Sequence, residues 1–147
     1  MGQPINATYL NQQIARAFAA LPGAGAWDTP TAIQCSDFGQ VTLYCSYTRG
    51  AADGAVDFRI EVSPDVTGTV WHRLTVMAVG GVVAGVDVES LVQSHDFGFT
   101  SQGAGREYFT YGPLDLLGTA ERIRISVQET GVVGTPGSCE IELRFGP

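Results

Sequence analysis

Residues 56–63 alternate apolar and polar side chains without interruption, and this pattern constrains the fold more than any other stretch of the chain. The apolar set is Val56, Phe58, Ile60 and Val62, and the polar set is Asp57, Arg59, Glu61 and Ser63. A period of two matches the β-strand, in which successive side chains point to opposite faces. We therefore expect a strand with one buried face and one solvent-facing face.

The same alternation returns at residues 40–48, 122–129 and 139–145. The residues expected to be buried there are Val41, Leu43, Cys45, Tyr47, Ile123, Ile125, Val127, Ile141, Leu143 and Phe145. Further strands are expected at 69–80, 81–93, 95–101 and 106–112, between segments rich in glycine and proline. About eight or nine strands without alternating helices predict an all-β fold, a single antiparallel β-sandwich or jelly roll.

Two loops in this pattern carry hairpin signals. Asp53-Gly54, a dipeptide that favours tight turns, separates the first two alternating stretches, and residues 130–138 separate the last two. We expect each loop to join two neighbouring antiparallel strands. In the second hairpin, exposed arginines are expected to lie across from exposed glutamates and to help set the register: Arg122, Arg124, Glu140 and Glu142.

The clearest helical pattern lies within residues 6–23. Asn6 or Thr8 is suited to cap the helix, and Pro22-Gly23 ends it. Apolar residues at spacings of three and four would form one stripe: Leu10, Ile14, Ala17, Phe18 and Leu21. We therefore predict a short N-terminal helix and an extended arm over residues 1–38, followed by the β-sandwich domain at 39–147.

This N-terminal segment is also the expected interaction element. A helix of this length is marginal in isolation, so its apolar stripe must dock on another surface. An aromatic residue on an arm usually fills a pocket, and Trp27 lies in the middle of this one. Docking within the same domain and docking on a neighbouring subunit both remain open. The candidate protein-interaction residues are Leu10, Ile14, Phe18 and Trp27, acting by helix-in-groove packing or arm exchange.

Composition narrows the function classes. The 147-residue chain has a formal net charge of -7, which argues against nucleic-acid binding because phosphate contacts require clustered positive charge. We find neither the pattern of a signal peptide nor an apolar run of roughly 20 residues for a membrane helix. The three cysteines are expected to be buried thiols in a protein made in a reducing cytoplasm, with pairing of Cys35 and Cys45 as the alternative.

The sequence offers no catalytic or cofactor motif. His72, His95 and Asp96 are the candidate metal ligands, but they lack the spacing of known metal motifs and are interpreted as ordinary residues. We therefore expect no enzyme activity, no cofactor and no metal. Aromatic residues leave a carbohydrate-binding module as an alternative function, with a platform drawn from Trp71, Phe97, Tyr108, Phe109 and Tyr111.

Two stretches carry a resemblance to a known group of proteins. The strand "VDFRIEVSPD" is followed by a turn and Trp71, and the later strand "AERIRISVQETG" precedes a Gly/Pro loop and a final strand. In this order, residues 39–146 resemble phage virion β-sandwich proteins, most closely the small head-decoration proteins that cement capsids.

This resemblance implies a structural protein that binds and stabilises a phage capsid from its exterior. The implied partners are further copies of the chain, commonly in a trimer, and the major capsid protein, without nucleic acid or membrane. A neck, tail or fibre component of the virion is the alternative within the same group. The polar face of Asp57, Arg59 and Glu61 is then expected to be outer wall or subunit contact.

Overall fold

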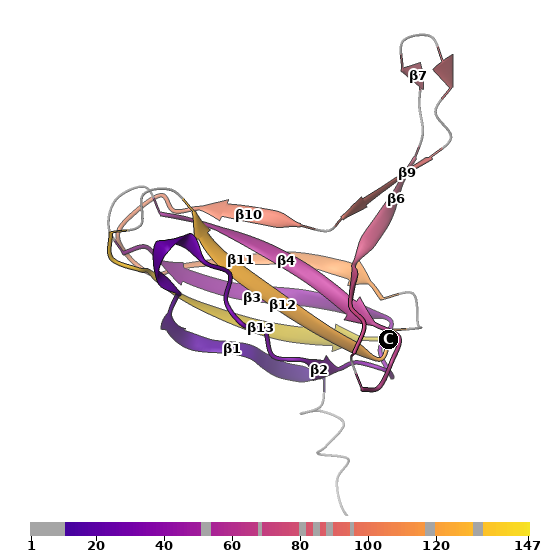
Figure 1. The fold of residues 1–147 in the computed structure, drawn as a ribbon, viewed down its shortest axis with the longest axis horizontal. Helices are drawn as coiled ribbons and strands as arrows, with labels where there is room; N and C mark the ends of the chain where they lie inside the picture. Colours follow the sequence, from indigo (N-terminus) through magenta and orange to yellow (C-terminus); the bar gives the residue numbers. More distant parts are fainter. Residues whose placement is uncertain are drawn as a thin grey trace, which may run out of the picture.

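The structure, a computed structural model, describes residues 11–50, 54–67, 69–79, 82–83, 86–87, 90–94, 96–116, 120–130 and 134–147. In this part of the chain, all regular structure is β apart from one short 3-10 turn, η1 (Gly23–Gly25). Two antiparallel sheets pack against each other as a sandwich (Figure 1). The predicted all-β class is confirmed, and the described residues include no helix able to span a membrane.

Each sheet has a four-stranded path. Sheet A has the order β1-β13-β3-β11, with bounds Gln12–Ala20, Ser138–Gly146, Gln40–Thr48 and Glu107–Asp115. Sheet B has the order β10-β4-β12-β2, with bounds Phe97–Thr100, Ala55–Ser63, Arg122–Thr130 and Ile33–Gln34. The short strand β5 (His72–Arg73) also pairs with β4 in sheet B. Both sheets therefore combine strands of the predicted sandwich domain with a strand from residues 1–38, β1 in sheet A and β2 in sheet B.

The core lies between the sheets and follows the alternating sequence pattern. In β4, Val56, Phe58 and Ile60 are fully buried, whereas Asp57 is exposed. The other predicted core residues are also buried: Val41, Leu43, Cys45, Tyr47, Ile123, Ile125, Val127, Ile141, Leu143 and Phe145. The prediction of inward-facing residues is therefore confirmed in β3, β12 and β13, because each sheet has one apolar face to cover. In β4 it holds up to Ile60, whereas Val62 is half-buried and Ser63 is fully buried.

The predicted N-terminal helix is wrong over the residues that the structure describes, because Gln12–Ala20 forms strand β1 along the edge of β13. Helix propensity is a weak preference, and here the backbone groups on the edge of β13 provide partners that a helix would leave unused. The strand is irregular, with register shifts on both sides of Arg16. Ile14 and Phe18 are exposed while Ala15 is buried, so the large apolar side chains of this strand point away from the core.

Both predicted hairpins are also wrong. β3 and β4 lie in different sheets, as do β12 and β13, so each loop crosses the sandwich instead of turning within a sheet. Arg124 consequently pairs across the strands with Glu61 on β4, and not with a glutamate of β13. A turn sequence fixes where the chain reverses, but the choice of neighbour depends on which sheet has an open edge.

In the sequence, a β-ribbon lies between strands β1–β5 and strands β10–β13 of the sandwich. β6 (Thr75–Val79) pairs with β9 (Ser90–Ser94), and β7 (Val82–Val83) pairs with β8 (Val86–Asp87). Strand structure within 69–80 and 81–93 is thus confirmed. Figure 1 shows this ribbon directed away from the two sheets.

A buried polar group ties the sheets together at one end. Tyr47 of sheet A donates its hydroxyl hydrogen bond to the Glu129 carboxylate of sheet B, and the Gly137 N–H donates to the same carboxylate at 3.0 and 3.1 Å. A Cβ at position 137 would lie 2.5 Å from a Glu129 oxygen, so glycine leaves the space that the carboxylate needs. Burial first, and the bond to Glu129 second, raise the pKa of Tyr47. The carboxylate is therefore paired although it lies in the core.

The three cysteines are free, buried thiols, as predicted, and Cys35 and Cys45 form no disulfide. Burial raises the pKa of Cys35 to about 11 and that of Cys139 to about 12, and it also raises the pKa of Cys45. The protonated forms of these thiols are therefore the ones that the folded core favours.

Candidate binding surfaces

The chain that follows β1 pairs with part of the free edge of β12 in sheet B, which brings the Trp27 ring over the outer face of that sheet. Gln128 pairs with Trp27 through a β-bridge, and its side-chain amide donates to the Gly25 carbonyl at 2.6 Å. The Asp28 N–H donates to the Val127 carbonyl at 2.9 Å. These bonds hold residues 25–28 along β12, so Trp27 docks on its own chain.

Two tryptophans on this face are stacked against arginines. The guanidinium carbon of Arg59 lies 4.1 Å from the centroid of the Trp27 ring, and that of Arg124 lies 4.3 Å from the Trp71 ring. Arg124 also forms an ion pair with Glu61 at 3.1 Å. Each of these cation–π interactions places a positive charge on the face of an aromatic ring and stabilises the folded chain by about 0.5–2 kcal/mol. On the polar face of β4, Arg59 and Glu61 therefore make intrachain contacts, whereas Asp57 is exposed.

A hollow of about 340 Å³ remains on this face, beside Trp27. Its lining includes Asp57 and Arg59, together with Arg73 and Asp96, which form an ion pair with each other. Of the four charged groups that line this hollow, Arg73 and Asp96 are paired with each other. Arg59 Nε is buried without a hydrogen-bond partner in the described structure, below the ring of Trp27.

Arg16 connects the edge of sheet A with the segment that covers sheet B. Its Nε donates to Asp28 Oδ2 at 2.6 Å, and its side chain is only 13% exposed. Its terminal nitrogens donate to the carbonyls of Cys139, Ala19 and Ala20 at 2.6–2.8 Å. This side chain therefore fixes the irregular end of β1 and the start of the covering segment together.

The outer face of sheet A differs because large apolar side chains reach solvent there. The exposed fraction is 74% for Tyr108, 53% for Ile14, 47% for Tyr44 and 38% for Phe18. Register places Ile14, Tyr44 and Tyr108 on the outer side of sheet A, since their neighbours in the ladder are outward-facing glutamates and Ser46. The Phe18 ring lies on the same side, 3.8 Å from the guanidinium carbon of Arg106, which donates to Ser46. The exposed aromatic residues of the described strands, Phe18, Tyr44 and Tyr108, all lie on this face.

A shallow hollow of about 430 Å³ lies between the two tyrosines. In the ladder, Tyr44 lies between Glu142 and Thr110, and the next outward row places Ser46 between Glu140 and Tyr108. The small Ser46 and Thr110 side chains leave the depression, and the tyrosines and glutamates form its rim.

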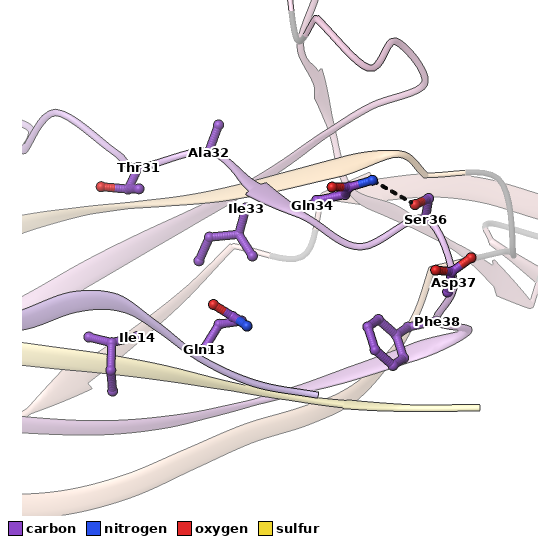
Figure 2. Close-up of a pocket in the computed structure, with 9 residues that line it drawn as sticks. All are labelled: Gln13, Ile14, Thr31, Ala32, Ile33, Gln34, Ser36, Asp37 and Phe38. Carbon is purple, nitrogen blue, oxygen red and sulfur yellow. Dashed lines mark hydrogen bonds between the residues drawn. The ribbon is translucent and has the colours of Figure 1, made fainter. Parts of the chain in front are cut away.

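A second depression lies where the free edges of the two sheets meet. Figure 2 shows Gln13 and Ile14 of β1 on one side of it, with Ile33 and Phe38 from the segment around β2 on the other. Its volume is about 450 Å³, and Gln34 donates a hydrogen bond to Ser36 at its rim. It is a cleft between strand edges, with few charged groups among its lining residues.

The structure separates the four predicted interaction residues. Ile14 and Phe18 are exposed on the outer side of sheet A, whereas Trp27 stacks on Arg59 over sheet B. Leu10 lies outside the described residues. Sequence reasoning missed Tyr44 and Arg106 as members of a surface cluster. One indication for Tyr44 was present in the sequence: in the alternating pattern of its strand, it stands among the polar, outward-facing residues.

The predicted aromatic platform is not formed as one surface. Phe97 stacks on Tyr111 with 3.9 Å between ring centroids, and Phe109 packs against the core. Tyr108 faces outward from sheet A, and Trp71 lies over Arg124 of sheet B. The five residues therefore belong to three separate places.

The predicted metal candidates are also apart from any cluster. His72 is exposed on β5, Asp96 pairs with Arg73, and His95 lies outside the described residues. Among the described residues, no group of three or more His, Cys, Asp or Glu side chains is arranged to hold a metal ion.

In comparisons with known proteins, no family model, no curated protein and no solved structure matches this chain.

Proposed function

We propose that the chain is a structural virion protein that binds and stabilises a phage capsid as an oligomeric decoration protein. The observation that carries the proposal is the β6–β9 ribbon, which is directed away from the sandwich (Figure 1). A two-stranded ribbon is marginally stable alone in water, so an additional surface is needed to stabilise it. A neighbouring subunit or the capsid shell would provide that surface.

The composition of the ribbon supports this role. Residues 75–94 are rich in valine and carry only Asp87 and Glu89 as charged residues. Both edges of a two-stranded ribbon present unpaired backbone groups, which favour pairing with a strand of another chain. An interface of standard size buries about 1,600 Å², and a closed trimer would repeat that contact three times.

The strand order supports a more specific fold assignment, the jelly roll. β1, β2, β3 and β4 pair in turn with β13, β12, β11 and β10, all antiparallel. This is the order expected when one long antiparallel ribbon is wrapped into two four-stranded sheets. Jelly rolls occur in viral capsid proteins and in lectins, so the assignment is compatible with a virion protein.

The exposed part of β1 provides a second contact region in this proposal. Ile14 and Phe18 lie on the outer side of sheet A at its edge. Together with Leu10 they would contact the neighbouring subunit, whereas Trp27 would act indirectly by holding the covering segment on its own chain. The chain would need no catalytic group for this role, because buried area supplies the binding free energy.

The test is the mass of the full chain in solution, measured by light scattering after size-exclusion chromatography. We expect a trimer for the full chain and a monomer when residues 76–93 are replaced by Asn-Gly. The milder substitution Val79→Lys keeps the ribbon length and should weaken the trimer as well. A variant without residues 2–10 measures the contribution of the N-terminal segment separately.

Capsid binding is tested with purified capsids of the phage that encodes the chain. We expect the chain to cosediment with the shell and the ribbon variant to remain in the supernatant. A full chain that is monomeric at all concentrations and does not cosediment would contradict the proposal. Cosedimentation only with isolated tails would instead favour a neck, tail or fibre component.

A further inference from the structure

We propose that the outer face of sheet A binds a neutral carbohydrate in the hollow between Tyr44 and Tyr108. This site is independent of the ribbon and does not depend on the capsid role. It also differs from the platform predicted by the sequence, because Tyr44 was not part of that platform and four of its five members lie elsewhere.

The tyrosines provide the stacking surfaces. They are diagonal neighbours on adjacent strands, which places their Cα atoms about 7–8 Å apart on the same face. Their exposed fractions of 47% and 74% leave ring surface accessible to a ligand. The C–H face of a pyranose ring is apolar and packs on such a ring, while a tyrosine hydroxyl remains available for hydrogen bonding.

Arg106 holds one side of the site in place. Its Nε donates to Ser46 Oγ at 3.0 Å, and its guanidinium carbon lies 3.8 Å from the Phe18 ring centroid and 5.3 Å from that of Tyr108. Because Arg106 contacts both aromatic rings and the floor of the hollow, it limits the rotamers of Tyr108 before a ligand arrives. Such preorganisation lowers the entropic cost of binding.

The glutamates provide hydrogen-bond acceptors for sugar hydroxyls. Glu142 Oε1 accepts from Gln12 at 2.6 Å and from Arg144 at 3.3 Å, and Glu140 lies 3.6 Å from Arg106. Each carboxylate has about four acceptor positions, so these contacts leave acceptor capacity for a ligand. The same contacts hold both carboxylates in defined positions at the rim.

The balance of charge indicates which ligand class fits. The two glutamates are matched by Arg106 and Arg144, so the site has no net charge to attract an anion or a cation. A neutral polyhydroxylated ligand uses fixed donors and acceptors together with aromatic surface, and this is what the rim offers. A subunit interface, in contrast, is depleted of charged residues at its centre. We therefore assign a neutral hexopyranose chain as the occupant of the hollow, whereas the second copy of this protein in the proposed function contacts only the β1 edge of the same face, at Ile14 and Phe18.

The test begins with the full chain on an array of immobilised neutral and sialylated glycans, followed by calorimetric titration of the best neutral glycan. We expect Tyr44→Ala and Tyr108→Ala each to weaken binding at least tenfold, and Glu142→Gln to weaken it less. Trp71→Ala is the matched control, since this aromatic residue lies over sheet B, and it should leave the dissociation constant unchanged. Circular dichroism and light scattering on each variant separate loss of binding from loss of folding or assembly.

Three results would overturn the assignment. The first is no binding to any neutral glycan, and the second is binding that survives the double variant Tyr44→Ala/Tyr108→Ala. The third is conversion of an oligomer into a monomer by that double variant, which would identify a second copy as the occupant of this face. A trimer that persists in the double variant, together with lost glycan binding, would support the assignment.

Discussion

The two outer faces of the sandwich differ in how far their aromatic side chains are covered. On sheet B, Trp27 and Trp71 are each stacked on an arginine, and residues 25–28 run along the adjacent strand. On sheet A, Tyr44 and Tyr108 remain largely exposed beside an open hollow, and the guanidinium carbons of Arg144 and Arg106 lie farther from their ring centroids, at 5.9 and 5.3 Å. One face is closed by its own chain and the other is left available.

This difference separates structural aromatics from candidate binding aromatics. An aromatic ring that already has a cation on its face and backbone bonds around it contributes to folding, and its removal should lower stability. A ring that is exposed contributes little to folding, and its removal should change binding instead. The comparison therefore predicts opposite readouts for substitutions that look alike in the sequence.

The largest effect is expected for Arg16→Ala, which would release the segment that closes sheet B. The substitution leaves Asp28 and three backbone carbonyls without their donor in a half-buried place. We expect the free energy of unfolding to fall by about 2–4 kcal/mol, measured by urea denaturation. Arg144→Ala is the control, because that arginine is half exposed, and it should cost less than about 1 kcal/mol. Equal losses of unfolding free energy in the two variants would remove the distinction between the faces.

Trp27→Ala should have the next largest effect on stability. It removes the stacking on Arg59 and uncovers part of β12, for an expected loss of about 2 kcal/mol. Trp27→Phe keeps an aromatic ring over the guanidinium and should retain about half of that stabilisation. An unchanged midpoint of urea unfolding for Trp27→Ala would mean that this residue is not structural.

The buried Cys35 thiol in the core between the two sheets makes the stability of the fold depend on pH. The pKa of Cys35 rises to about 11 in the folded chain, above its ordinary value of 9.0, so the unfolded chain releases this proton first as pH rises. The resulting stabilisation is complete below about pH 9 and is lost on the way to about pH 11. Between about pH 8 and 10, Cys35→Ala should reduce the loss of stability by about 1 kcal/mol relative to the unmodified chain.

That measurement uses urea unfolding in the presence of a reducing agent at each pH. Ser36→Ala, one residue further along the chain, is the control and should retain the full pH dependence. An identical pH dependence in Cys35→Ala would show that this thiol is not protonated more strongly in the folded state.

The smallest change in stability is expected for Tyr108→Ala on the open face. With 74% of the residue exposed, the free energy of unfolding should change by less than about 0.5 kcal/mol. The same variant should lose glycan binding if the proposed site is correct. A loss of stability as large as that of Trp27→Ala would place Tyr108 among the structural aromatics and remove the contrast between the faces.

Part of the candidate site was within reach of sequence reasoning. The alternation in residues 40–48 already placed Tyr44 on the polar side of its strand, where an aromatic residue is unusual. Its assembly with Tyr108 and Glu142 was out of reach, because these residues come from β3, β11 and β13 and meet only through sheet register. The same limit explains the failed platform, whose members are spread over both sheets.

The sequence by itself determined which face is buried in β3, β4, β12 and β13. Val56, Phe58 and Ile60 are inside because a two-residue period of apolar side chains leaves one stable orientation toward a core. Only the tertiary structure decided which strands and which side chains became neighbours. β1 became a strand because β13 offered an edge, and Arg124 met Glu61 because the chain crossed to the other sheet. Local patterns describe a strand's two faces, whereas its neighbours are set by contacts that are distant in the sequence.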